Sequence, residues 1–305
     1  MTRIRDKRSI CLAAILFWGA SFPIGLAQTN PPARPVEVSL KAKEGDLLVS
    51  GRINNSRLLA FKLDTGFGIT TISPEVAESL QLQRAGGLTI DGIAGEERAA
   101  TFRNAELDFA GMIFRPRRVA ALPSDKEERK KDRDGILGAD FFRRFIVELD
   151  VAARVMRLYE PSEFKYAGAG EVIPLRFKRD TPIVEGTIVT ANHEIVNGRF
   201  EIDTGCDDAL CLGQDFVAAN RLLDKAKPKP RAARRGVGGS TPVQHGALEE
   251  LRLGKLIIKK PSTNFFLEGS PAGKGQAGHI GLGALQRFKM IFDYSRQQMI
   301  LEPRA

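Results

Sequence analysis

The amino-acid sequence contains an internal repeat, which limits the folds that the chain can adopt. The segment Phe61–Gly66 (FKLDTG) recurs as Phe200–Gly205 (FEIDTG), 139 residues further along the chain. The segment Gly135–Asp150 recurs as Gly278–Asp293 at an offset of 143, and both copies are 16 residues long without a gap. Two copies of roughly 130 residues are each the size of a domain, so the repeat predicts two equivalent lobes and excludes a solenoid.

Both halves have the pattern of a mainly β protein. Val, Ile and Leu occur in short runs between turn residues, and the 305 residues include 30 glycines. We expect strand pairs at Val36–Leu40 with Leu47–Ile53 and at Val172–Phe177 with Ile183–Thr190. Helices are expected to be few and short: Pro74–Leu80, Ala139–Phe145, Gln214–Leu223 and Leu282–Phe288. The prediction is two homologous lobes, residues 36–165 and 166–305, related by a pseudo-twofold axis.

The N-terminus has the pattern of an export signal. Four basic residues precede an apolar run from Ile10 to Leu26, and small residues lead up to Ala27. We therefore predict a signal peptide over residues 1–27, a linker over 28–35, and a periplasmic or secreted mature protein. The alternative is an uncleaved membrane anchor, because the apolar run has about the minimum length for a span.

Charge and metal-binding patterns limit the choice of partners. The net charge is +9, and the basic segment Lys225–Arg235 and the mixed segment Asp125–Asp134 contain no aromatic residue. Both are predicted to be solvated loops, and we expect no nucleic-acid partner, because such a site combines basic and aromatic side chains. The three histidines and the cysteines lack zinc-ligand spacing, so we expect no metal and no cofactor. Cys206 and Cys211 form either a disulfide or two small buried thiols.

The repeated turn has chemical consequences. Asp64 and Asp203 each follow a strand that reads as buried, and an unpaired buried carboxylate is costly. If the lobes pack about a twofold axis, the two aspartates meet there and share one proton, because two like charges that close cannot both ionise. Such a pair supplies an acid beside a base. Thr65 and Thr204 are expected to point to the backbone of the opposite lobe.

These motifs resemble the pepsin and retropepsin superfamily of aspartic peptidases, and most of all the bacterial retropepsin-like peptidases, here with two copies fused. Both Asp-Thr-Gly triplets match the active-site motif, in which Gly66 and Gly205 complete the turns. Asp134–Gly138 is similar to the hydrophobic-hydrophobic-Gly element that supports the motif, and in the second copy His279 replaces an apolar residue.

The resemblance implies an aspartic endopeptidase acting on a peptide or protein substrate, with Asp64 and Asp203 catalytic. It also implies two glycine hairpins that close over the peptide, and two Asp residues that face its backbone. Phe67 stands where the family usually has Ala or Ser, so its ring is expected to narrow one subsite. The implied substrate-binding residues are Phe67, Gly92, Gly95, Asp207, Asp208, Gly236 and Gly239.

Two other functions remain open at this level. The chain could be a catalytically silent peptide-binding module of the same fold, although both carboxylates are intact. It could also be a peptidase that matures itself or one dedicated partner, with cleavage near the N-terminus or in Lys225–Arg235. Because both aspartates lie in one chain, a monomer is expected, and contact with a membrane is expected only if the signal segment is retained.

Overall fold

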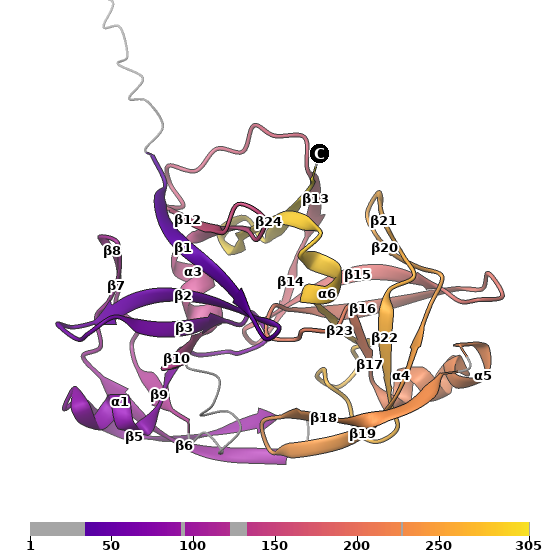
Figure 1. Ribbon diagram of the computed structural model, residues 1–305, viewed down its shortest axis with the longest axis horizontal. Coiled ribbons are helices and arrows are strands. Elements are labelled where there is room, and N and C mark those ends of the chain that lie inside the picture. The colour runs from indigo at the N-terminus through magenta and orange to yellow at the C-terminus, as the bar shows by residue number, and fades with distance from the viewer. Residues whose placement is uncertain (1–33, 93–94, 123–132, 227, 305) are drawn as a thin grey trace, which may run out of the picture. The chain divides into compact units, whose positions relative to one another are not determined.

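The computed structural model describes residues 34–92, 95–122, 133–226 and 228–304. It is mainly β, and its described strands form sheets of 15 and 10 strands (Figure 1). The predicted fold class is therefore confirmed. No helix in this part of the chain is both long and apolar enough to span a bilayer.

The two halves contain the following elements. The N-terminal half comprises β1 (Val36–Lys43), β2 (Asp46–Ile53), β3 (Leu59–Leu63), β4 (Thr71–Ile72), α1 (Pro74–Ser79), β5 (Gln83–Gly92), β6 (Gly95–Arg103), β7 (Leu107–Phe109), β8 (Met112–Phe114), β9 (Val119–Ala121), β10 (Gly135–Leu137), α3 (Ala139–Arg144), β11 (Ile146–Asp150) and β12 (Val155–Tyr159). The C-terminal half comprises β13 (Glu171–Pro174), β14 (Arg176–Lys178), β15 (Thr181–Val189), β16 (Ile195–Asp203), β17 (Leu210–Leu212), α4 (Gln214–Ala219), α5 (Leu222–Ala226), β18 (Lys229–Gly236), β19 (Gly239–Ala247), β20 (Glu250–Leu253), β21 (Leu256–Lys259), β22 (Ser262–Phe266), β23 (Gly278–Gly281), α6 (Leu282–Leu285), β24 (Phe288–Asp293) and β25 (Gln298–Pro303).

Strand pairing repeats between the halves. In the N-terminal half β3 runs parallel to β10, β10 pairs with β4, and β4 runs parallel to β9. In the C-terminal half β16, β23, β17 and β22 make the same three pairings in the same order. Each half also contains a β-hairpin whose closing glycines are separated by two residues, β5–β6 in the first half and β18–β19 in the second. The sequence repeat is thus a repeat of topology.

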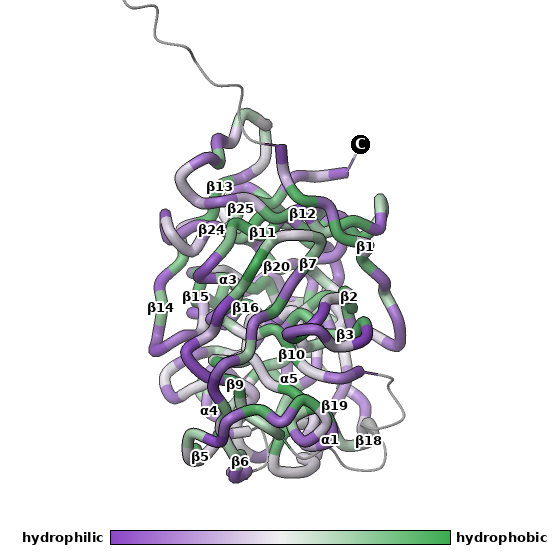
Figure 2. The backbone as a smooth tube through the Cα atoms, turned by 90° about the vertical axis from the view of Figure 1, so that its left-hand side faces the viewer, coloured by the Kyte–Doolittle hydropathy of each residue, from purple (hydrophilic) through white to green (hydrophobic). Residues whose placement is uncertain are grey.

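A shared sheet joins the halves. Its strand order is β13-β25-β24-β11-β12-β1, with three strands from each half. The seam is the antiparallel pair β11–β24, in which Val147 lies opposite Phe292. Apolar stretches of β11, β24 and β25 are visible as green segments in Figure 2. Both halves therefore contribute strands to one continuous sheet.

Both predicted strand pairings are only partly right. The segment Val172–Phe177 does not pair throughout with Ile183–Thr190, because Glu171–Pro174 pairs with β25 and only Arg176–Lys178 pairs with β15. The predicted pairing of Val36–Leu40 with Leu47–Ile53 fails in the same way, because the first four residues of β1 pair with β12 and only Leu40 of the predicted segment pairs with β2. Alternation of apolar residues indicates a strand but not its neighbour, which explains the error.

The helix predictions hold with two changes. α1 and α3 occupy the predicted segments to within one residue. The predicted helix over 214–223 is split into α4 and α5, and Arg221 between them has a φ of 50°. A left-handed residue of this kind cannot continue a right-handed helix. α6 ends at Leu285, and β24 begins at Phe288, which was predicted to be helical.

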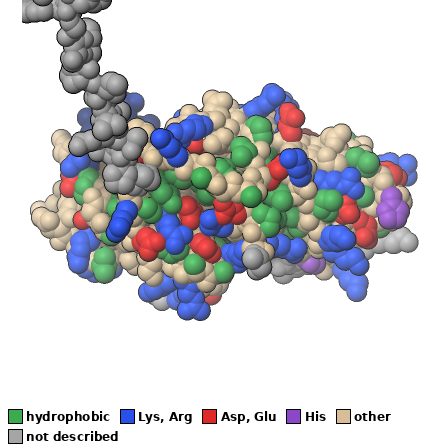
Figure 3. Space-filling view, turned by 90° about the horizontal axis from the view of Figure 1, so that it is seen from above, with side chains coloured by type: hydrophobic (Ala, Val, Ile, Leu, Met, Phe, Trp, Pro, Cys, Tyr) green, Lys and Arg blue, Asp and Glu red, His purple; other side chains and the backbone are tan. Residues whose placement is uncertain are grey.

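The basic segment was also mispredicted. Lys225–Arg235 is not a solvated loop, because it contains the end of α5 and most of β18, which pairs with β19. The sequence of β18 has no alternation of apolar and polar residues, so its pairing with β19 could not be predicted from periodicity. The mixed segment Asp125–Asp134 lies almost wholly outside the described residues. On the face shown in Figure 3, Lys and Arg side chains are interspersed with Asp and Glu.

Aromatic side chains fill much of the hydrophobic core. Phe141, Phe142 and Phe145 are at most 1% exposed and Phe288 is 8% exposed, so their prediction as core residues is confirmed. Phe142 contacts Phe292 of the other half edge to face, with ring centroids 5.3 Å apart. Pairs of this kind add about 0.5–1.5 kcal/mol beyond their buried area. The core therefore continues across the seam and fixes one half against the other.

Candidate active site

The two Asp-Thr-Gly turns begin where two buried strands end. Asp64 follows β3, and its N–H donates to Leu137 O of β10 at 3.1 Å. Asp203 is the last residue of β16 and lies opposite Gly281 of β23. The predicted supporting segments therefore run directly beside the turns. Pairing with a second buried strand therefore fixes the backbone position of each aspartate.

The threonines bind the two turns to each other. Thr65 Oγ1 donates to Ile202 O at 2.7 Å, and it accepts the N–H of Thr204 at 3.0 Å. Thr204 Oγ1 donates to Leu63 O, and it accepts the N–H of Thr65, both at 3.0 Å. Both threonines are fully buried. The prediction that each hydroxyl reaches the backbone of the opposite half is confirmed.

The glycines allow the carboxyl groups to approach. Asp64 Oδ1 accepts the N–H of Gly66 at 3.1 Å, and Asp203 Oδ1 accepts the N–H of Gly205 at 2.8 Å. A Cβ on Gly205 would lie 2.0 Å from Asp64 Oδ2, and one on Gly66 would lie 2.8 Å from Asp203 Oδ1. Each glycine thus makes room for the opposite aspartate. The two carboxyl groups are close enough to hydrogen-bond to each other.

Two basic side chains flank the aspartates. His279 Nδ1 lies 2.8 Å from Asp203 Oδ2, and its Nε2 lies 3.1 Å from Glu201 Oε2. Lys62 Nζ lies 3.7 Å from Asp64 Oδ2 and 3.1 Å from Asp46 Oδ1. Both basic residues are 8% exposed. The sequence marked His279 as a departure from the family pattern but missed Lys62, although a lysine between Phe61 and Leu63 in a buried strand was a usable signal.

Lys62 also joins the two halves through the backbone. Its Nζ donates to Gly205 O of the opposite turn at 2.7 Å. Asp46, its nearest carboxylate, is held in turn by Arg133 Nη1 at 2.6 Å. The buried charges of Lys62 and Asp46 are thus each paired with an opposite charge, as burial of charged groups requires.

These surroundings give the two aspartates different acidities. Burial and the nearby charge of Asp203 raise the pKa of Asp64 to about 6, against the lowering effect of Lys62. Burial also acts to raise the pKa of Asp203, but the charge and hydrogen bond of His279, together with Lys62, outweigh it and lower this pKa to about 2. Two chemically identical groups are thus set apart by their neighbours.

The glycine hairpins meet each other at their tips. A Cβ on Gly92 would lie 2.1 Å from Val237 O, and one on Gly238 would lie 2.4 Å from the nitrogen of Gly95. In Figure 1 the two hairpins run towards each other along the bottom of the view. Gly92 with Gly95 and Gly236 with Gly239 are the closing pairs of the two turns. Gly92 and Gly95 of the first hairpin therefore contact Val237 and Gly238, which lie between the predicted glycines Gly236 and Gly239 of the second.

Asp207 and Asp208 contact one of these hairpins. Arg234 of β18 makes ion pairs with both, and its Nη2 lies 2.6 Å from Asp208 Oδ2. Burial of Arg234 acts to lower its pKa, but the two carboxylates outweigh burial and raise it. The resemblance implied that these aspartates face a substrate backbone, and in this structure their ionic partner is the hairpin. Arg234, which the sequence analysis placed in a loop, connects the hairpin to the second turn.

Phe67 lies directly after the first turn. Its carbonyl accepts the N–H of Ala139 at 2.7 Å, so its backbone is fixed against α3. The side chain is half-buried and is not part of the hydrophobic core of the described residues. That its ring narrows a subsite beside the aspartates stays a prediction.

Three possible metal ligands come together next to the second turn. Donor atoms of Cys206, Asp208 and Cys211 lie within 4.8 Å of one another. Both thiols are free, with Sγ atoms 3.6 Å apart, and the Cys211 hydrogen bond together with burial raises the pKa of Cys206. A thiol that resists ionisation and a carboxylate already bound to Arg234 are poor metal ligands. The donor set does not fit a cation well.

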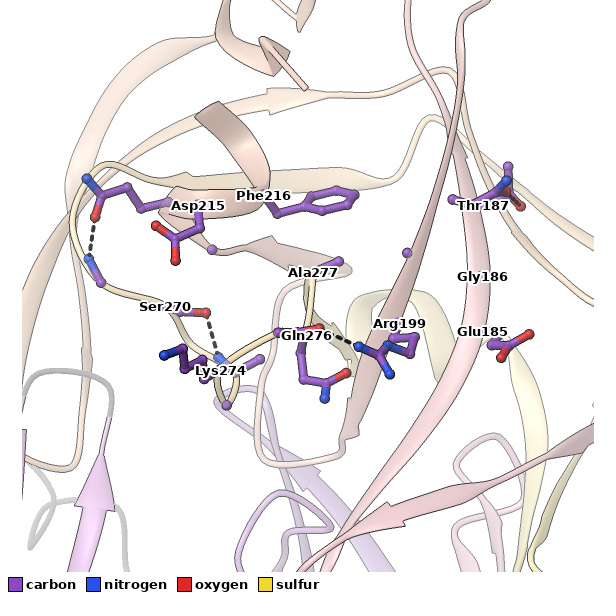
Figure 4. A pocket seen from close by; sticks show the side chains of 18 of the residues that line it. Glu185, Gly186, Thr187, Arg199, Asp215, Phe216, Ser270, Lys274, Gln276 and Ala277 are labelled. Atoms are coloured by element: carbon purple, nitrogen blue, oxygen red, sulfur yellow. Dashed lines mark hydrogen bonds between the residues drawn. The ribbon is translucent and has the colours of Figure 1, made fainter. Parts of the chain in front are cut away.

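A separate hollow lies in the C-terminal half. It has a volume of about 1150 Å³ and is bounded by β15, β16, α4 and the segment 269–277 (Figure 4). Its charged side chains are of both signs, including Glu185, Arg199 and Lys274. None of the predicted site residues lines it. It is therefore distinct from the paired turns.

Comparison with known protein families gives a match in the N-terminal half of the chain. No curated protein matches the sequence. The aspartyl protease family model matches residues 49–141, a range that holds the first Asp-Thr-Gly turn and its supporting segment. The match supports membership of an aspartic protease family, with Asp64 in the matched range.

Proposed function

We propose that this chain is an aspartic endopeptidase that hydrolyses peptide bonds with a water molecule activated between Asp64 and Asp203. The proposal is carried by one observation. Two Asp-Thr-Gly turns, cross-linked by their threonine hydroxyls, bring two nearly buried carboxyl groups within hydrogen-bond reach. The aspartyl protease match to residues 49–141 supports it independently.

The proposed reaction uses one proton shared by the two carboxyl groups. The ionised carboxylate takes a proton from water, whose oxygen attacks the peptide carbonyl carbon, while the protonated carboxyl donates to the carbonyl oxygen. The tetrahedral diol then collapses. The carboxylate that protonated the carbonyl oxygen takes a proton back from one hydroxyl of the diol. The other carboxyl passes the proton taken from water to the leaving nitrogen, and the C–N bond breaks. Both carboxyl groups end as they began, and no covalent intermediate forms.

The hairpins and the turns would bind the peptide. We propose that the strand-like substrate lies between the aspartates and the junction of the two hairpins, with Gly92, Gly95, Gly236 and Gly239 near its backbone. Entry then requires the hairpin tips to separate, since they contact each other across Gly92 and Val237. Asp207 and Asp208 would meet the substrate only after a change at Arg234.

The organisation and location are part of the same proposal. Residues 36–165 and 166–305 would be the two lobes of one monomeric enzyme, since a single chain supplies both aspartates. Residues 1–27 would act as a signal peptide followed by the linker 28–35, so the enzyme would act on peptides in the periplasm or outside the cell. The basic and apolar pattern of residues 3–26 supports export.

Peptide cleavage tests the proposed function. The protein without residues 1–27 is incubated with a peptide library at pH 3 to 7, with and without a statine-type inhibitor, and products are identified by mass spectrometry. We expect internal cleavage that the inhibitor suppresses. Binding of peptides or inhibitor without any cleavage would instead favour the silent binding module.

We predict that hydrolysis declines above about pH 6. The reaction requires one protonated carboxyl, and Asp64, whose pKa is raised to about 6, loses its proton there. Above this value kcat/KM should fall about tenfold for each pH unit. The measurement is kcat/KM against pH on one cleaved peptide. A rate that keeps rising beyond pH 7 would contradict the assignment of the acid.

We predict that Phe67→Ala broadens specificity. A ring that fills part of a subsite excludes bulky side chains at a cost of about 1–3 kcal/mol. Its removal should therefore raise cleavage of peptides with a large residue at one position next to the scissile bond, by about tenfold to a hundredfold. Library profiling of both proteins checks this. An unchanged profile would mean that the ring does not line a subsite, and activity appearing only in the variant would mean that Phe67 blocks the site.

A further inference from the structure

The repeat is not symmetric beside the aspartates. Lys62 and Ile136 occupy the positions in the N-terminal half that Glu201 and His279 occupy in the C-terminal half. Lys62 on β3 and Glu201 on β16 each lie two residues before the aspartate of their half. Ile136 on β10 pairs with Lys62, and His279 on β23 pairs with Glu201. One aspartate is therefore served by a lysine and the other by a histidine.

His279 is held between two carboxyl groups. Asp203 Oδ2 faces its Nδ1 at 2.8 Å and Glu201 Oε2 faces its Nε2 at 3.1 Å. Glu201 is itself fixed, because its Oε1 accepts the N–H of Gly273 at 2.8 Å. A neutral imidazole has one N–H donor, so two carboxylate acceptors on its two nitrogens favour the imidazolium form. All three side chains are at most 9% exposed, and water competes little for these bonds.

Lys62 holds Asp64 much less closely. Its nearest carboxylate is Asp46 at 3.1 Å, and it donates a hydrogen bond to Gly205 O at 2.7 Å, whereas Asp64 lies at 3.7 Å. The positive charge of Lys62 is therefore divided between two carboxylates. Asp203 receives a direct charge-assisted hydrogen bond that Asp64 lacks, and such bonds are about twice as strong as neutral ones.

We propose that His279 is a positioning residue that remains an imidazolium and holds Asp203 ionised, so that the shared proton resides on Asp64. Asp203 is then the base that takes the proton from water, and Asp64 is the acid that protonates the peptide carbonyl. The inference rests on the proposed function and extends it, because the two aspartates receive fixed and different roles. A symmetric pair has no such preference.

The electrostatic surroundings agree with this assignment. Burial acts to lower the pKa of His279, but Asp203 and Glu201 outweigh it and raise this pKa well above its ordinary value. The other titratable groups nearby are Cys211 on β17, opposite His279, Cys206 in the turn, and Lys62 on β3. Among these, the hydrogen bond from Cys211 and burial raise the pKa of the Cys206 thiol, so this thiol adds no charge beside Asp203 at acidic or neutral pH, and Lys62 favours an ionised Asp203 as well.

A measurement that needs no activity tests the charge of His279. The chain has three histidines, at 193, 245 and 279, so nitrogen-15 NMR of the imidazoles yields three titration curves. We expect one histidine to keep both ring nitrogens protonated beyond pH 7.5, to disappear in His279→Gln, and to titrate at lower pH in Asp203→Asn. The exposed His193 provides the internal reference. A His279 curve that follows the reference, or a neutral ring at pH 7, would overturn the proposal.

The pH profile of hydrolysis tests the role. We expect His279→Ile, which installs the residue of the other half, to move the acidic limb of kcat upwards by one unit or more from its position near pH 2. At pH 3 a shift of one unit corresponds to a loss of about twofold in kcat and a shift of two units to about tenfold, with little change in KM. His193→Asn, at an exposed turn position, is the control and should keep the wild-type profile.

The two proposals fail in different ways. If wild-type protein shows no hydrolysis that depends on both aspartates, the proposed function fails, while the NMR titration still decides the charge of His279. If hydrolysis depends on both aspartates but His279→Ile keeps the wild-type acidic limb, the role of His279 is refuted and the peptidase stands. If His279→Ile does not fold, His279→Gln provides the same comparison with a polar side chain of similar length.

Discussion

Asp64→Asn and Asp203→Asn will each abolish peptide hydrolysis and leave the protein folded. An amide matches the carboxyl in shape but can neither accept the proton from water nor donate an acidic one. Proton transfer by a positioned side chain contributes about 10²–10⁴-fold, and each variant removes half of a coupled pair. We expect a loss of at least about a thousandfold in kcat/KM, measured on the best peptide of the library.

The two variants should differ in stability. The pKa of Asp64 is raised in the folded state, so its ionisation opposes folding, and stability falls as the pH rises from about 4 to about 6. Asp64→Asn removes this penalty and should melt at or above the wild-type temperature at pH 7. Asp203 has a lowered pKa, so its charge stabilises the fold above about pH 4, and that contribution disappears as the pH falls towards 2. Asp203→Asn should therefore melt lower at pH 7.

A matched control separates these effects from a general one. Asp215→Asn changes an exposed aspartate in the first turn of α4 and should keep both the activity and the melting temperature of the wild type. If Asp64→Asn or Asp203→Asn retained substantial hydrolysis, the proposed mechanism would be wrong. If both unfolded, the aspartates would be structural residues.

Thr65→Val will destabilise the folded protein strongly. Valine keeps the shape of threonine but leaves the carbonyl of Ile202 and the N–H of Thr204 buried without their partner. Each unsatisfied buried group costs about 1–3 kcal/mol, so the free energy of unfolding should fall by about 2–6 kcal/mol. Thr204→Val should have a similar effect through Leu63 O and the N–H of Thr65. Denaturant unfolding measures both.

Coupling between the threonines offers a sharper test. The four hydrogen bonds form one network across the halves, so the double variant should lose less than the sum of the single losses. Thr89→Val, at an exposed position of β5, is the control and should be near neutral. Additive losses would mean that the two hydroxyls act separately, and wild-type stability in Thr65→Val would mean that the network contributes little.

The plan of two equivalent halves could be predicted from the amino-acid sequence alone. The repeats at Phe61–Gly66 and Gly135–Asp150 are contiguous, so a single reading of the chain finds them and gives the mainly β halves and the paired aspartates. The contacts of Thr65 and Thr204 across the halves follow from the same symmetry. Local periodicity also identified the buried phenylalanines of α3, because helical spacing alone reveals which face is buried.

The residues that surround the two aspartates could not be predicted in this way, because they come together only in the folded protein. Lys62 lies beside the carbonyl of Gly205, 143 residues away, and His279 lies 78 residues from Glu201. Arg234 reaches Asp207 because a basic segment predicted to be a loop is a strand of the hairpin. The departures from symmetry are single substitutions whose partners come from strands distant in the chain. Repeats and periodicity are local properties of a sequence, whereas the charge next to an aspartate depends on which distant strands fold against it.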